Sequence, residues 1–178
     1  MRVPIIAAAL SGALLAQPAV AHVTLDPPQA AAGSTVRLTL RVPHGCAGAA
    51  TEGLTLRLPD GVTAARPMPK PGWQLAVTRR VLEAPVSNGH GGTITEAPAE
   101  ITWAAGSLPD DQFDEFVLML RAPEQPGETL WLPVVQHCAG GATANWTEVP
   151  TAGRRVTDYR FPAPSLRLLP ARARTEGN

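Results

Sequence analysis

Hydrophobic and polar positions alternate with a period of two in short runs along most of the chain. The runs are separated by 19 prolines and 16 glycines, and no long stretch carries an uninterrupted helical period. Alternation with period two places one face of a strand on a core and the other face in water. The runs that predict strands cover residues 34–42, 53–59, 73–81, 100–105, 114–122 and 128–136.

Short strands at near-regular spacing, bounded by turn residues, predict an all-β fold. We expect a single antiparallel β-sandwich, immunoglobulin/fibronectin-like or cupredoxin-like, with Trp103 and Trp131 in its core. Residues 83–98 are rich in Gly, Ser, Asn and Pro and predict a long exposed hairpin connection. Alternation is lost after about residue 150, so we place the sandwich at residues 22–165. Residues 166–178 then form a C-terminal tail, either a last edge strand or unstructured.

Residues 1–21 have the three-part pattern of a secretory signal peptide. An arginine is followed by an apolar run from Ile5 to Leu15 and by small residues that end at Ala21. A membrane-spanning helix needs about 20 apolar residues, which neither this run nor any later segment provides. We therefore predict cleavage after Ala21, a periplasmic or extracellular mature protein, and no membrane span in that mature chain.

Charge and cysteine content narrow the possible partners and the covalent framework. The chain carries 15 basic and 15 acidic residues, and this balance gives no electrostatic reason to expect nucleic-acid binding. Cys46 and Cys138 are the only two cysteines, and an exported chain makes a disulfide between them the default expectation. The alternative is a thiolate metal site, although the C-x-x-C spacing typical of such sites is missing.

Cleavage after Ala21 would make His22 the first residue of the mature protein. A terminal histidine offers its α-amine and its ring Nδ1 to one metal ion, a chelate that no internal histidine can form. Nitrogen donors favour Cu(II) among the first-row divalent ions, with zinc or nickel as the second choice. Cu(I) prefers sulfur ligands, but only Met68 and Met119 would remain as thioethers. Alternatively, a histidine at this position has no role, because signal peptidase tolerates most residues after the cut.

Seven segments spread over almost the whole mature chain carry a resemblance to a known family. They are "AHVTL" (21–25), "RVPHGCAG" (41–48), "LPDGV" (58–62), "PMPKPGW" (67–73), "LPDDQFDEF" (108–116), "PVVQHCAGG" (133–141) and "NWTEVP" (145–150). Through them the chain resembles the YcnI-like domain of bacterial copper-homeostasis proteins. The resemblance implies an exported β-sandwich with a Cu(II) site of the single-histidine brace type, in which a carboxylate joins the terminal histidine and a tryptophan stands close to the metal.

Transferred to this sequence, the resemblance makes His22 the brace histidine, Glu115 the carboxylate and Trp146 the tryptophan. Glu148 is the first substitute for the carboxylate and Asp26 the second. Glu115 could instead simply face solvent, and Trp146 could be an ordinary core aromatic.

The remaining histidines have mostly structural explanations. His44 and His137 flank the two cysteines, so a disulfide could bring them together as a secondary metal site. A solvated loop histidine beside Gly45 is the simpler interpretation. His90 lies in the Gly-rich segment with no acidic or histidine partner nearby.

We expect a copper-binding protein and not an enzyme: an exported Cu(II) carrier or chaperone in copper homeostasis. Its expected partners are the copper ion and, through the resemblance, periplasmic copper chaperones or copper transport proteins. One alternative is a copper-dependent oxidative enzyme, but such oxygenases use a second histidine and exposed aromatics, and only 4% of the residues here are aromatic. The other alternative is a structural sandwich without a metal.

Overall fold

The computed structural model describes residues 22–89 and 91–171. The predicted signal peptide, His90 and residues 172–178 lie outside the described residues. The strands are β1 (Thr24–Asp26), β2 (Gln29–Ala31), β3 (Thr35–Val42), β4 (Thr51–Arg57), β5 (Ala65–Pro67), β6 (Gln74–Ser87), β7 (Thr93–Leu108), β8 (Asp114–Arg121), β9 (Thr129–Trp131), β10 (Val134–Cys138), β11 (Thr143–Trp146) and β12 (Ser165–Leu169). Two short 3-10 helices, η1 (Ala139–Gly141) and η2 (Val156–Asp158), complete the regular structure.

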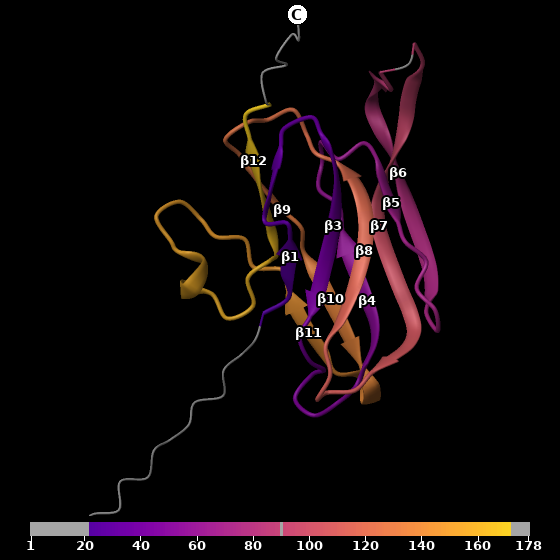
Figure 1. Cartoon of the computed structure of the whole chain (residues 1–178), viewed down its shortest axis with the longest axis vertical. Helices are drawn as coiled ribbons and strands as arrows, with labels where there is room; N and C mark the ends of the chain where they lie inside the picture. Colours follow the sequence, from indigo (N-terminus) through magenta and orange to yellow (C-terminus); the bar gives the residue numbers. More distant parts are fainter. Residues whose placement is uncertain (1–21, 90, 172–178) are drawn as a thin grey trace, which may run out of the picture.

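The strands form three sheets. A four-stranded sheet has the order β1-β3-β8-β5, and a five-stranded sheet has the order β11-β10-β4-β7-β6. These two sheets face each other, and a smaller sheet in the order β2-β12-β9 lies beside them (Figure 1). All strand pairs are antiparallel except β2 with β12, which is parallel. The predicted antiparallel β-sandwich is therefore confirmed.

The core lies between the two larger sheets, where the inward positions of alternating strands meet. Leu38 and Leu40 of β3 and Leu118 of β8 are completely buried, as are Leu54 and Leu56 of β4 across the interface. The predicted core residue Trp103 is also completely buried, whereas Trp131 is only half-buried. Period-two alternation thus places the leucines as expected.

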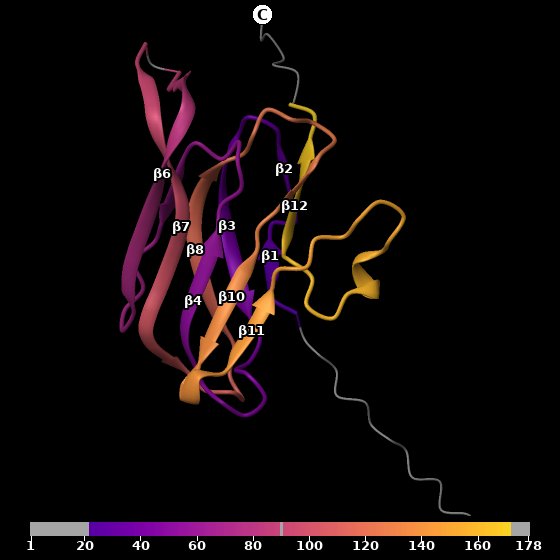
Figure 2. The ribbon, with the colours of Figure 1, turned by 180° about the vertical axis from the view of Figure 1, so that it is seen from behind.

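The predicted long connection over residues 83–98 is wrong. The strands β6 and β7 continue through most of it, pairing Val86 with Ile94 and Ser87 with Thr93, so that only residues 88–92 connect them. The reason is that the turn-forming residues are concentrated at the Asn-Gly-containing tip, while residues on either side still have partners across the hairpin. The paired ends of β6 and β7 project as an arm beyond the body of the sandwich (Figure 2).

The sandwich also continues past the boundary that we predicted at residue 165. Strand β12 pairs with β2 on one side and β9 on the other, so it is the central strand of its sheet and not an edge. Leu166 and Leu168 are buried while Arg167 between them is exposed. The alternation in "SLRLL" therefore attaches these residues to the core.

The predicted disulfide between Cys46 and Cys138 is present. It joins the loop before β4 to the last residue of β10, closing a loop that spans most of the sandwich. Within the described part of the chain, no helix has the length and hydropathy that crossing a membrane requires.

Candidate metal centre

His22 lies two residues before Thr24, the first residue of β1, which is an edge strand of the four-stranded sheet. Val23 and Leu25 point into the core and are 2% and 8% exposed, respectively, whereas Thr24 between them is exposed. The same alternation leaves His22 exposed. Burial of two apolar neighbours therefore holds the backbone of His22 at the sheet edge while its own side chain stays accessible to a ligand.

Trp146 supports the ring of His22. It ends β11 and is 1% exposed, and its ring centroid lies 5.7 Å from that of His22 with an interplanar angle of 68°. Phe161 packs on the same indole, with centroids 5.2 Å apart at 75°. Both contacts have the edge-to-face geometry that aromatic pairs prefer. The structure thus brings together two of the three residues predicted for the site.

A buried polar chain that the sequence reasoning missed lies behind Trp146. The indole Nε1 donates to Oε1 of Gln136 at 3.0 Å, and Gln136 is only 1% exposed. Its Nε2 donates in turn to Oγ1 of Thr51 at 2.6 Å and to the carbonyl oxygen of His44 at 2.8 Å. Thr51 Oγ1 lies 3.8 Å from Sγ of Cys138. One feature of the sequence could have indicated this polar chain: Gln136 is a polar residue at an inward position of an alternating strand. Val134 and Cys138, two positions before and after it, are both buried.

Glu115 lies on the outer face of the four-stranded sheet and is engaged by Arg41. The guanidinium donates to Glu115 Oε1 through Nε at 3.2 Å and through Nη2 at 3.0 Å. Arg41 is paired with Thr24 of β1 on its other side, so Glu115 is two strand spacings from β1. Two spacings are about 10 Å. The structure does not place Glu115 beside His22.

The two substitute carboxylates are held differently. The carboxylate of Glu148 accepts a hydrogen bond from the backbone N–H of Phe161, whose ring packs on Trp146. Asp26 is exposed at the end of β1. Within residues 22–89 and 91–171, no hydrogen bond or ion pair joins Glu115, Glu148 or Asp26 to His22.

A groove of about 340 Å³ opens beside His22. Residues 22–25 form one wall, and Pro162, Ala163, Pro164 and Ser165 form the other. Val156 and Thr157 from the η2 segment complete the rim. The exposed imidazole therefore borders a space in which a ligand or an additional side chain could approach it.

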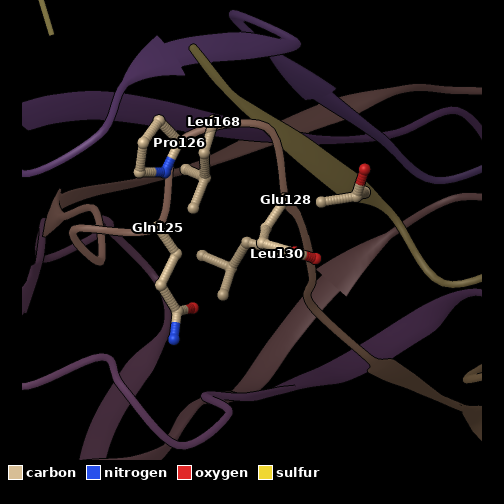
Figure 3. Close-up of a pocket in the computed structure, with 6 residues that line it drawn as sticks. Gln125, Pro126, Glu128, Leu130 and Leu168 are labelled. Carbon is tan, nitrogen blue, oxygen red and sulfur yellow. The ribbon is translucent and has the colours of Figure 1, made fainter. Parts of the chain in front are cut away.

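A second hollow, of about 460 Å³, lies elsewhere on the sandwich and is lined by Leu130 and Leu168 together with Gln125, Pro126, Glu128 and Thr129 (Figure 3). It contains a single carboxylate and none of the predicted site residues. Ligand sites usually combine an apolar wall with several convergent polar groups. The hollow therefore does not compete with His22 as a candidate metal centre.

The possible secondary metal site at His44 and His137 does not form, because each ring contacts another partner. His44 Nδ1 lies 2.6 Å from the carbonyl oxygen of Gly45, and His137 Nε2 lies 3.0 Å from Thr55 Oγ1. Among the residues that the structure describes, no group of three or more His, Cys, Asp or Glu side chains is placed to hold a metal ion. A metal at His22 would therefore need a second donor besides the imidazole, and no preformed cluster of side chains supplies one among the described residues. A free α-amine has the right chemistry to be that donor.

Comparisons with known proteins give matches to a family and to a curated protein, and a match to a solved structure that bears on the fold. The family model described as "Domain of unknown function (DUF1775)" matches residues 22–168. The "Copper-binding protein CutI" of Bacillus subtilis (strain 168) is 27% identical over 143 residues, a match that covers 78% of this chain and 62% of CutI. A crystal structure of an uncharacterized protein from Nocardia farcinica with an immunoglobulin-like fold is 33% identical, with a TM-score of 0.63, and covers 83% of this chain and 98% of that one. The immunoglobulin-like form of the predicted sandwich is thereby supported.

Proposed function

The chain belongs to the DUF1775 family, the family of YcnI, and from that premise we propose that it binds copper as Cu(II) with His22 as the anchoring ligand. The name of the Bacillus subtilis relative supports copper as the metal. The match spans 62% of that relative, so its remaining length has no counterpart in the alignment.

The observation that carries the proposal is an exposed histidine ring packed edge-on against a buried tryptophan. Trp146 covers one side of the ring, and the groove beside His22 leaves another side open. In the chain as written, the backbone nitrogen of His22 is an amide. Cleavage after Ala21 would turn it into an amine, and amine and imidazole would then form the single-histidine brace. Two nitrogen donors suit Cu(II) better than the other first-row divalent ions.

Glu115 is our proposed carboxylate ligand. To serve, its side chain must leave the guanidinium of Arg41 and reach across β3 toward β1. The exposed ion pair opposes this by only about 0.2–1 kcal/mol. Glu148 is the alternative, since its partner Phe161 already packs against Trp146. Asp26, four residues after His22, is the second alternative.

The proposed role is that of an exported carrier or chaperone in copper homeostasis, acting in the periplasm or outside the cell. An exposed ligand at a sheet edge suits metal transfer, because a partner can approach it and replace ligands one at a time. Periplasmic copper chaperones and copper transport proteins are the proposed partners. No step in this role requires substrate turnover by the protein itself.

One comparison tests the brace. Mature protein that begins at His22 is titrated with Cu(II) next to the same protein with its α-amine acetylated. We expect tight one-to-one binding by the first and at least hundredfold weaker binding by the second, since acetylation removes the amine donor of the chelate. Equal tight binding by both proteins would refute the brace, and no binding by either would refute the copper function.

The carboxylate is tested with Glu115→Gln, Glu148→Gln and Asp26→Asn in the same mature protein. We expect Glu115→Gln to weaken Cu(II) binding by roughly tenfold or more, in line with the loss of one charged ligand, and the other two variants to bind nearly as the parent does. Arg41→Met should strengthen binding, because it removes the competing guanidinium. A loss confined to Glu148→Gln would transfer the role to Glu148.

A further inference from the structure

The strongest unexplained feature near His22 is the amide of Gln136. It is buried on an inward position of β10, and its oxygen and nitrogen both have partners. Burying an amide is costly unless its hydrogen bonds are made. An apolar residue would suit the neighbouring inward positions, where Val134 and Cys138 lie. A glutamine here needs an explanation beyond filling the core.

The contacts of Gln136 point in two directions. Oε1 accepts the Nε1 hydrogen bond of Trp146, which is the residue against which the ring of His22 packs. Nε2 donates to Thr51 Oγ1 and to the carbonyl oxygen of His44, beside the disulfide. The strands that carry Thr51 and Gln136 are neighbours in the five-stranded sheet. One end of the amide is thus held by a rigid part of the sandwich, and the other end holds the indole.

This hydrogen bond restricts the rotation of Trp146. Phe161 and the core constrain the indole by packing. The acceptor at 3.0 Å adds a directional constraint, because the indole N–H must point at Oε1 of Gln136. Since the indole edge sets where the ring of His22 can rest, the orientation passes on to the exposed imidazole. Residues that hold a metal ligand in place from behind commonly change affinity or exchange rate when they are replaced.

We propose that Gln136 is a positioning residue for the metal centre: through Trp146 it fixes the orientation of the His22 ring and thereby slows the release of bound copper. This inference rests on the proposed function, because it takes His22 as the copper ligand. Gln136 itself does not touch the metal. It affects how long the copper remains bound and the coordination geometry of the bound ion.

The test uses Gln136→Met, which keeps an unbranched side chain of similar length but removes the acceptor for the indole. Trp103→Phe is the control, because it removes another indole hydrogen bond of the same sheet, from Trp103 Nε1 to the carbonyl oxygen of Met68, two strands away from Gln136. Both variants should lower the melting temperature to a similar extent. Only Gln136→Met should act on the copper site.

With mature protein loaded with one equivalent of Cu(II), we measure the release rate to excess EDTA and the electron paramagnetic resonance spectrum. Gln136→Met should release copper roughly five- to tenfold faster, the factor expected from losing one buried hydrogen bond, and should show a changed copper hyperfine splitting. Trp103→Phe should match the parent in both. Release at the parental rate with a parental spectrum in folded Gln136→Met would overturn the inference and leave the proposed function standing.

A measurement on metal-free protein distinguishes failure of the proposed copper function from failure of the positioning role of Gln136. In metal-free protein, Gln136→Met should speed hydrogen exchange at the Trp146 indole N–H and shift the ring resonances of His22, while Trp103→Phe should do neither. If the parent protein fails to bind copper, the proposed function falls, and unchanged Trp146 and His22 signals in Gln136→Met would independently refute the positioning role. Should Gln136→Met not fold, Gln136→Leu is used, which also removes the acceptor for the indole without burying a charge. We expect it to shift the His22 signals as Gln136→Met does, and parental signals in folded Gln136→Leu would count against the role.

Discussion

Two aromatic clusters pack into the same core, and they differ in exposure and in their polar contacts. The first cluster consists of Trp73, Trp103 and Phe116, with Phe116 edge-on to both tryptophans at 4.9 and 5.5 Å. The second consists of His22, Trp146 and Phe161. Trp103 and Trp146 are equally buried, but only the second cluster ends in an exposed ring that can bind a ligand.

The hydrogen bonds of the two buried indoles, Trp103 and Trp146, also differ in the kind of acceptor. Trp103 donates to a backbone carbonyl at 3.3 Å, a partner that any residue could supply. Trp146 donates to the side chain of Gln136 at 3.0 Å, a partner that needed a particular amino acid. The first cluster is therefore mainly packing. The second combines packing with a specified polar chain, as expected where the direction of a neighbouring group matters.

The largest predicted effect comes from removing the disulfide that backs the second cluster. The bond joins residues separated by 92 positions, and a crosslink of that length contributes about 4.6 kcal/mol in the chain-entropy model. We expect the Cys46→Ser/Cys138→Ser double variant to melt about 10 °C lower, by circular dichroism. Each single variant is the control for a free thiol. An unchanged melting temperature would show that the sandwich does not depend on this link.

The next effect concerns the first cluster. A Cβ added to Gly106 would lie 2.1 Å from ring atoms of Trp73, so Gly106→Ala must displace that indole from Phe116. We expect a loss of about 2 kcal/mol in the free energy of unfolding, measured with urea, and unchanged binding of Cu(II). Gly53→Ala is the matched control, because its added Cβ comes no closer than 3.4 Å to any neighbouring atom, here the Cβ of His137. If Gly106→Ala weakened copper binding at unchanged stability, the separation of the two clusters would be wrong.

The clusters also differ in how far the sequence could predict them. Alternation within single strands correctly predicted the sandwich and the burial of Trp103, because that pattern is local. The central position of β12 was missed, since it depends on partners distant in the chain. The arm formed by β6 and β7 is a local hairpin, and it was missed because turn-forming residues at its tip led us to treat the whole segment as a connection. The same applies to the site. His22 and Trp146 were proposed from a family resemblance, whereas the pairing of Glu115 with Arg41 and the role of Gln136 follow from the register of strands and the packing between them.

The smallest predicted effect is a titration in the loop that borders the second cluster. Hydrogen bonds from the side chain and the backbone N–H of Thr151 to the phenol oxygen lower the pKa of Tyr159 below its usual value of about 10. Tyr159 is the only tyrosine, so ultraviolet absorbance against pH follows it alone. We expect Thr151→Val to raise the pKa of Tyr159, because the hydroxyl contact is lost while the N–H remains. Thr157→Val, in the same loop, serves as the control and should leave the curve in place.

The sign of this shift also sets its effect on stability. When the pKa of a group is lower in the folded protein than in the unfolded protein, the group stabilises the folded state at pH values above the unfolded-state pKa. This stabilisation is lost as the pH falls through the folded-state pKa. The contribution of Tyr159 is therefore confined to alkaline solution and should be absent at neutral pH, where copper would be bound. If copper loading at His22 moved the titration of Tyr159, the loop would be coupled to the second cluster. Identical curves with and without copper would restrict the second cluster to His22, Trp146 and Phe161.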